Sequence, residues 1–147
     1  MSAELLFSVA NPVALVGWIA LVGAPLAPRA VDVLAGWLLP GALSLAYAVL
    51  ILVHFADASG GFGTLADVQA LFTDADMALA GWIHFLAFDL FIGAWIVRDA
   101  RRLGLAHWMV LPILPFAFLL GPAGLLAYMG LRLIRGRGAP QSNEVAT

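Results

Sequence analysis

An aspartate in the middle of an apolar stretch is the residue of this sequence best placed to do chemistry. Asp89 lies near the centre of residues 77–97, about 3 Å from the midpoint along a helix axis. A carboxylate at the centre of a membrane-spanning helix costs about 2.5–3.5 kcal/mol on insertion scales, so it faces the protein interior, carries a proton or has a partner. Proton transfer or ligand binding is the first interpretation. A neutral aspartate hydrogen-bonded between helices is the alternative.

A histidine in the same stretch is the second candidate. His84 precedes Asp89 by five residues, which on a helix is about 7.5 Å along the axis and about 140° around it. The two side chains therefore do not share a face, and they reach one ligand only if it lies across the helix. We predict Asp89 and His84 as the catalytic acid and base, since burial disfavours the charged form of each. An imidazole satisfied by a carbonyl is the alternative for His84.

Aromatic and helix-breaking residues near this pair are candidates for binding a flat apolar ligand. Phenylalanines crowd around the aspartate, although core packing explains them as well. Tryptophans lie toward the span ends, a distribution typical of an interfacial aromatic belt. Pro122 frees the carbonyl of Phe118 in the middle of the last apolar stretch, and that carbonyl needs a polar partner unless the proline marks a simple packing kink. The candidate substrate-binding residues are Trp82, Phe85, Phe88, Asn11, His54 and Pro122.

The composition excludes most other classes of protein. Of the 147 residues, 63% are hydrophobic and 11% are charged, and the mean hydropathy is +1.00. This predicts a polytopic membrane protein and argues against a nucleic-acid binder. Cysteine and lysine are both missing from the sequence, so thiolate sites and Schiff bases are excluded. The three histidines lack metal-ligand spacing, and the chain carries no nucleotide or flavin motif. We therefore expect no metal and no cofactor.

Four apolar stretches are long enough to cross a membrane, at about residues 5–24, 33–55, 77–97 and 108–131. Short connections favour antiparallel neighbours and so predict an all-α, four-helix membrane bundle in one domain, residues 1–135, with both termini on one side. A flexible polar tail is expected over 136–147. Two capping boxes, Thr64-x-x-Asp67 and Thr73-x-x-Asp76, predict a short interfacial helix followed by the start of the third span. Three arginines lie on the predicted side of the termini and four on the opposite side, so the arginine count does not decide the orientation in the membrane. Because the acidic loop has no arginine, we expect it outside the cell and the loops with Arg29 and Arg98 in the cytoplasm.

The third and fourth stretches resemble a known family. The string Trp82-x-His84-x-x-x-x-Asp89-Leu90-Phe91, then Arg98-Asp99 and Gly121-Pro122-x-Gly124, is similar to the ABA4-like family (abscisic-acid-deficient-4-like, formerly a domain of unknown function). The resemblance extends over roughly residues 4–135. It implies a four-helix integral membrane protein. Plant members are needed to make neoxanthin from violaxanthin, so the resemblance also implies a carotenoid isomerase in which His84 and Asp89 are the polar pair.

The function expected from these observations is a cofactor-free isomerase acting on a carotenoid or another isoprenoid lipid. One alternative is a non-enzymatic carotenoid- or lipid-binding subunit that assists a partner enzyme. Another is a small proton-coupled transport component. Richness in alanine, leucine and arginine without lysine is typical of a GC-rich bacterium, so we expect the bacterial inner membrane. The expected partners are the isoprenoid substrate, membrane lipids and a second copy of the chain, with no nucleic acid.

Overall fold

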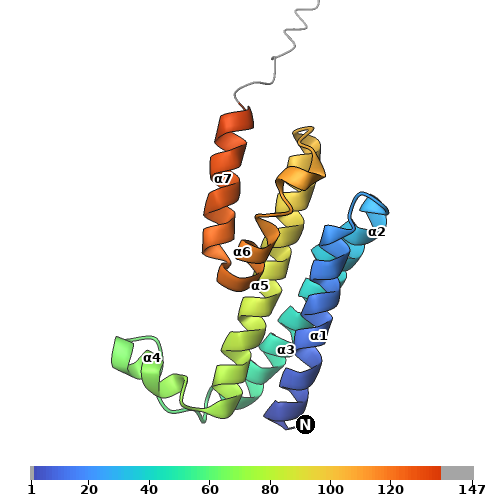
Figure 1. Cartoon of the computed structure of the whole chain (residues 1–147). Helices are drawn as coiled ribbons and strands as arrows, with labels where there is room; N and C mark the ends of the chain where they lie inside the picture. Colours follow the sequence, from blue (N-terminus) through green and yellow to red (C-terminus); the bar gives the residue numbers. More distant parts are fainter. Residues whose placement is uncertain (1, 137–147) are drawn as a thin grey trace, which may run out of the picture.

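A computed structural model describes residues 2–136, and all its regular elements in that range are helical (Figure 1). The predicted all-α class is thus confirmed. Two short turns interrupt or connect the helices: a π-helical turn, η1 (Leu34–Leu38), and a 3₁₀ turn, η2 (His107–Met109). The seven α-helices are α1 (Ala3–Val22), α2 (Pro28–Val33), α3 (Leu39–His54), α4 (Leu65–Leu71), α5 (Ala75–Arg102), α6 (Leu114–Leu120) and α7 (Pro122–Gly136).

Within the described range, three helical segments are long and apolar enough to cross a membrane. They are Ala3–Val22, Pro28–His54 and Ala75–Arg102, and they overlap the first three stretches predicted from the sequence. α5 packs against both α1 and α3 and contributes the largest share of the buried side chains. Large apolar side chains such as Ile19, Leu45 and Leu52 point outward instead. An apolar outer surface is what helices in contact with lipid tails require.

The second long segment contains a widened turn that the sequence analysis did not predict. α2, η1 and α3 follow one another without a break, and the N–H of Leu39 donates to the carbonyl of Leu34, five residues back. The widened turn lies directly before Pro40, which has no N–H and whose ring crowds the preceding turn of a regular helix. A π-helical turn absorbs that crowding without ending the helix.

The acidic connection between the second and third long segments contains the predicted short helix. Thr64 caps α4 by accepting a hydrogen bond from the N–H of Asp67 at 3.1 Å. The second predicted cap is displaced by one residue. Asp74, rather than Thr73, caps α5, and its carboxylate accepts from the N–H groups of Asp76 and Met77 at 3.0 Å each. The hydroxyl of Thr73 donates to the carbonyl of Ala70 instead.

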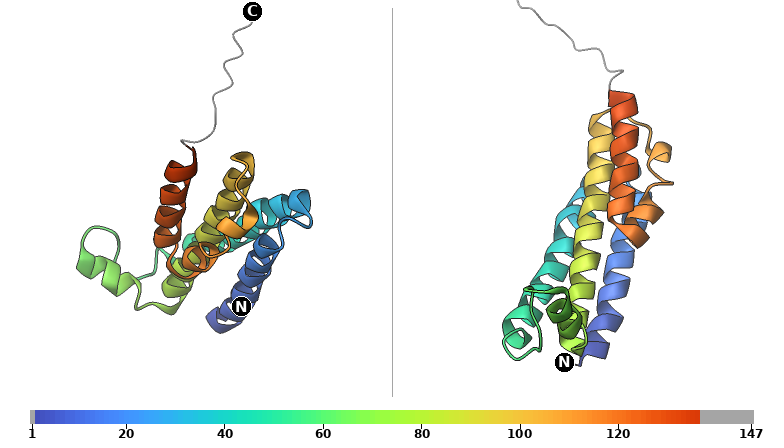
Figure 2. Two further views of the ribbon diagram at one scale, coloured as in Figure 1. Left: turned by 45° about the horizontal axis from the view of Figure 1, so that its top comes forward. Right: turned by 90° about the vertical axis from the view of Figure 1, so that its left-hand side faces the viewer.

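The C-terminal stretch departs from the predicted fourth span. Instead of one helix over 108–131, the chain forms α6, breaks at Gly121 and continues as α7. α7 then runs parallel to α5: Gly121 contacts Asp89, and Tyr128 and Arg132 farther along α7 bind Asp99 farther along α5. Both views in Figure 2 show α7 beside the C-terminal half of α5. The four-helix arrangement with both ends on one side is therefore wrong for the described residues.

The reversal at Gly121 has a local cause. Pro122 has no N–H to continue the hydrogen bonding of α6, and Gly121, with no Cβ, accepts a conformation (φ 12°, ψ −77°) outside the helical region. Hydropathy cannot distinguish one spanning helix from two shorter helices of the same composition. The predicted tail beyond Gly136 lies outside the described residues.

The charged residues are unevenly distributed between the two ends of the molecule, and the reversal adds Arg132 and Arg135 to the arginine-rich end. The six arginines between residues 2 and 136 all lie at the end where α5 and α7 finish, whereas Glu4 and the aspartates of the α3–α5 connection lie at the other end (Figure 1). At the arginine-rich end, Asp32 forms an ion pair with Arg101. The imidazole of His107 lies 3.0 Å from the carbonyl of Val22 and joins η2 to the end of α1.

Candidate functional site

The predicted key residue, Asp89, lies at the centre of the 28-residue helix α5 and is buried, with 8% of its surface exposed. Its Oδ2 atom is buried and has no hydrogen-bond partner among the described residues. An unsatisfied polar atom in a dry interior costs about 1–3 kcal/mol. Proteins retain such atoms mainly where a ligand, a proton or a water satisfies them.

The carboxyl group of Asp89 lies against the junction of α6 and α7. A Cβ atom at position 121 would overlap with its Oδ1 atom. The carboxyl therefore occupies the side-chain space of the residue that precedes α7. The first N–H groups of any helix have no partner within the helix and carry partial positive charge. The break in the C-terminal stretch thus brings a polar helix end to the depth of Asp89.

A second buried polar atom in this region also lacks a partner. Trp18 of α1 is 5% exposed, and its Nε1–H finds no acceptor among residues 2–136. Its ring packs against Phe118 with centroids 5.4 Å apart, and against the backbone of Gly93, one turn after Asp89. Trp18 offers a donor and Asp89 an acceptor in the same α1–α5–α6 contact. Trp18 was not among the candidates predicted from the sequence, because the position of a tryptophan in an apolar stretch does not show whether its N–H is buried in the folded protein.

An apolar cavity of about 420 Å³ opens between α1, α5 and α6. Three predicted binding residues line it: Asn11 of α1, and Trp82 and Phe85 of α5. The indole N–H of Trp82 donates to Oδ1 of Asn11 at 3.0 Å, and the amide of Asn11 donates to the carbonyl of Phe7 at 2.8 Å. The hydrogen bond between Trp82 and Asn11 holds two lining side chains together in a cavity whose walls are otherwise mostly hydrocarbon.

The cavity and Asp89 follow the same stripe of α5. Asp89 comes three residues after Leu86, which lines the cavity, so the carboxyl lies about 4.5 Å farther along the helix axis on that side. From α6, Phe118 lines the cavity and precedes Gly121 by three residues. Asp89 is not itself in the cavity wall. A ligand filling the cavity would end one helical turn from the carboxyl.

The other predicted catalytic residue lies on a different side of α5. The ring of His84 stacks on Phe88 with centroids 4.6 Å apart and packs at a tilt against Tyr47 of α3 with centroids 5.3 Å apart, so the structure does not bring it together with Asp89. Phe88 also faces away from the cavity of Asn11 and lines a separate one toward α3. The sequence spacing of about 140° had placed His84 on another face. The contacts of His84 with Phe88 and Tyr47 account for its position without a ligand shared with Asp89.

The two remaining candidates lie elsewhere. His54 ends α3, and its Nδ1 lies 3.6 Å from a carboxylate oxygen of Asp76, at the acidic end of the molecule. Pro122 begins α7 and is exposed on its outer side. Its contribution is the chain reversal, not a cavity wall. Over residues 2–136, no three histidine, aspartate or glutamate side chains converge to hold a metal ion.

The fold and the site define a helical protein with membrane-length helices, a short helical hairpin, and a buried carboxyl group where the hairpin turns. The sequence model described as ABA DEFICIENT 4-like matches residues 5–128. The chain therefore belongs to the ABA4-like family, as its Trp82-to-Phe91 string indicated. No curated protein and no solved structure shows significant similarity to it.

Proposed function

We propose that this protein isomerises a carotenoid or another isoprenoid lipid within the membrane, with Asp89 as the proton-transferring group. The observation that supports this most directly is the buried Oδ2 atom of Asp89, which has no hydrogen-bond partner among residues 2–136 and lies about one turn beyond an apolar cavity. A membrane lipid with a long hydrocarbon body suits the cavity, and an oxygen near its end suits the carboxyl of Asp89. Family membership favours a carotenoid, since plant members take part in neoxanthin synthesis.

The chemistry requires one acid and one base and no redox partner. Opening an epoxide to an allenic alcohol removes a proton from a vinylic carbon, and the C–H electron pair becomes the new double bond. One C–O bond of the epoxide breaks, and its oxygen takes up a proton. Atoms and electrons balance within the substrate. A protonated Asp89 supplies the proton to oxygen through one carboxyl oxygen and accepts the carbon-bound proton through the carboxylate that remains.

The geometry favours this single-carboxyl scheme over the Asp89–His84 pair. His84 lies among Tyr47 and Phe88 on the side of α5 that faces α3, whereas the cavity lies toward α1 and α6. The start of α7, which lies against the Asp89 carboxyl, supplies a partial positive charge that stabilises negative charge on oxygen. We expect the protein in the inner membrane of a bacterium, where both the substrate and the enzyme dissolve in lipid.

The test is turnover of an epoxy-carotenoid by membranes that contain the full chain. The expected product has the mass of the substrate and a different retention time. Asp89→Asn, which keeps the shape and removes the proton, should lower the rate about a hundredfold or more. The matched control is Asp57→Asn at an exposed aspartate of the acidic connection, and it should leave the rate unchanged. His84→Gln should also retain activity; its loss would favour the two-residue scheme.

Two other outcomes point to the rival functions. Pigment that co-purifies without any product, in wild type and Asp89→Asn alike, would overturn the enzyme and favour a binding subunit that assists a partner. A substrate-dependent pH change inside sealed proteoliposomes, lost in Asp89→Asn, would favour proton-coupled transport. The cavity beside Asp89 serves any of the three functions, so turnover is the measurement that separates them.

A further inference from the structure

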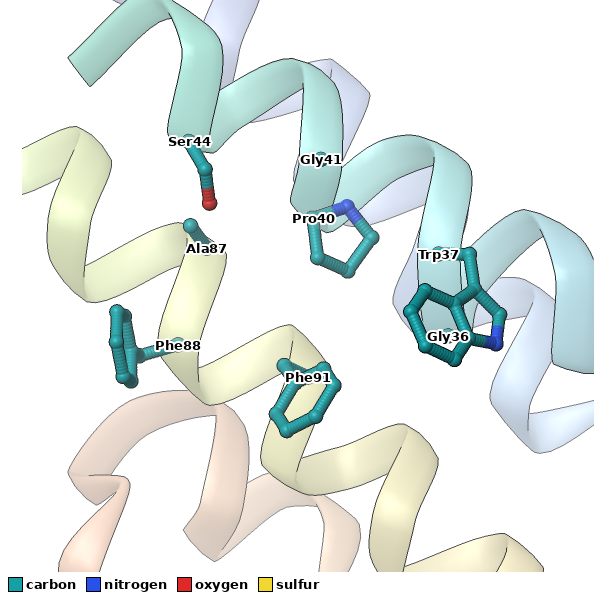
Figure 3. Close-up of a pocket in the computed structure, with 8 residues that line it drawn as sticks. All are labelled: Gly36, Trp37, Pro40, Gly41, Ser44, Ala87, Phe88 and Phe91. Carbon is teal, nitrogen blue, oxygen red and sulfur yellow. The ribbon is translucent and has the colours of Figure 1, made fainter. Parts of the chain in front are cut away.

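A second cavity lies on the other side of α5, toward the η1–α3 segment. Its volume is about 270 Å³, and Figure 3 shows Phe88 and Phe91 on one wall and Trp37, Gly41 and Ser44 on the other. Apart from the Ser44 hydroxyl and the Trp37 indole N–H, these walls are hydrocarbon. Trp37 is 68% exposed and Phe88 is 56% exposed, so the cavity is a groove on the surface that faces lipid.

Protein atoms leave this groove empty. A Cβ atom on Gly41 would have no heavy atom within 4 Å. Figure 3 shows Gly41 on the η1–α3 wall, with neither phenylalanine ring of α5 reaching it. An apolar groove of this kind between two membrane helices accepts a hydrocarbon chain.

A cationic side chain lies at one end of the groove. Arg98 follows Phe91 by seven residues, two turns farther along the same stripe of α5 and about 10 Å along the axis. Its Nη1 atom lies 3.0 Å from the position that a Cβ on Gly36 would take, and Gly36 lines the groove. Since α5 ends at Arg102, Arg98 is one turn from the end of a membrane-length helix. That is the depth of lipid headgroups.

Arg98 has no acidic partner among residues 2–136, although two aspartates lie at its end of the molecule. Asp32 forms its ion pair with Arg101. Asp99 accepts hydrogen bonds from Tyr128 at 2.7 Å and from Arg132 at 2.8 Å. Both carboxylates are thus engaged elsewhere, and the partly buried guanidinium of Arg98 is left to bind an anion from outside the chain. Guanidinium groups bind phosphate through two parallel hydrogen bonds.

We propose that this groove binds an anionic phospholipid, with the phosphate group on Arg98 and one acyl chain between Gly41 and the rings of Phe88 and Phe91. The excess of arginine at this end, six against two aspartates in the described chain, adds long-range attraction for the same charge. The site is separate from the Asp89 cavity and does not depend on the proposed isomerase activity.

Native mass spectrometry of the full chain in detergent tests the site. The protein is mixed with phosphatidylglycerol or phosphatidylcholine carrying identical acyl chains. More bound phosphatidylglycerol is expected. Arg98→Gln should lower its binding constant about tenfold, as expected for loss of one charged hydrogen-bonding group. Arg102→Gln is the matched control, because it removes the same charge at an exposed position of the same helix end and should change binding little.

A second pair of variants tests the groove without changing charge. Gly41→Leu fills the gap and should abolish the retained lipid, whereas Gly130→Leu, at a position of α7 that is equally open, should not. Equal binding of both lipids, or equal loss in Arg98→Gln and Arg102→Gln, would overturn the proposal. Displacement of the lipid by millimolar inorganic phosphate would also overturn the proposal, because the acyl chain of the lipid would then contribute nothing to binding.

Discussion

The carboxyl group of Asp89 occupies the space where a side chain on residue 121 would begin, so α5 and the α6–α7 junction pack together only because residue 121 is glycine. This contact joins the one buried carboxyl of the described chain to the point where the C-terminal hairpin reverses. It also places the start of α7 at the middle of α5 and, as a consequence, brings the arginines of α7 to the end where α5 finishes.

Gly121→Ala should destabilise the protein. The added methyl group meets Asp89, and overpacking of this kind costs about 1–3 kcal/mol. Asp89→Ala removes the obstructing carboxyl, so the double variant should lose less stability than the sum of the two single variants. Thermal unfolding in detergent measures all three. Gly130→Ala is the control, with no heavy atom within 4 Å of the new methyl; if Gly121→Ala were as stable as this control, the contact would be disproved.

The N-terminus and the end of α7 should lie on opposite sides of the membrane. Cytoplasmic segments carry an excess of arginine, so the Arg98–Arg135 end should face the cytoplasm and the acidic end the exterior. The chain contains no cysteine, which allows single cysteines to be labelled with an impermeant maleimide in intact cells. Ser2→Cys and Ala66→Cys should react from outside, whereas Leu103→Cys and Arg135→Cys should react only after the membrane is permeabilised.

Position 135 distinguishes the hairpin from a continuous fourth span. A spanning helix over 108–131 would return residue 135 to the side of residue 2, whereas the hairpin leaves it with residue 103. Labelling of Arg135→Cys together with Ser2→Cys would contradict the fold described above. The comparison holds whichever side proves to be cytoplasmic.

Tyr128→Phe should loosen the contact between α7 and α5. Tyr128 is fully buried and donates a 2.7 Å hydrogen bond to Asp99, which Arg132 also binds. The side chain of Asp99 is only 14% exposed, so removing the Tyr128 hydroxyl leaves its carboxylate with one hydrogen-bond donor fewer. We expect this to lower the free energy of unfolding by about 1–3 kcal/mol. Hydrogen exchange should increase in α7 but not in α1. Uniform exchange across both helices would show that the pair does not hold the hairpin.

Filling the cavity beside Asp89 should prevent pigment binding. Leu119 lines that cavity from α6 and is 64% exposed, so Leu119→Trp can fold with the indole occupying the opening. Leu126→Trp is the matched control on α7, where Leu126 is 73% exposed and lines none of the cavities described above. The absorbance of co-purified carotenoid per mole of protein should fall only in Leu119→Trp. Equal pigment in both variants would place the ligand elsewhere.

Local patterns in the sequence predicted much of this architecture. Apolar stretches of spanning length mark the three long helices, because the need to satisfy every backbone group in lipid leaves few other solutions. Thr64 and Asp67 mark α4, since an N-cap depends on residues within one turn. The depth of Asp89 also follows from counting along one helix. The 140° angle to His84 likewise showed that the two side chains leave α5 on different sides.

Only the tertiary structure decided how the segments meet. Whether Gly121-Pro122 bends a spanning helix or reverses it depends on what packs against the break, and the partner proved to be Asp89, 32 residues away in the sequence. The cavity combines Asn11, Trp82 and Leu119 from three helices. The partly buried guanidinium of Arg98 lacks an acidic partner in the described chain because Asp32 pairs with Arg101 and Asp99 pairs with Arg132. These contacts join residues that are distant in the chain. Several alternative pairings have similar free energies, and only the packing of the whole molecule determines which of them form.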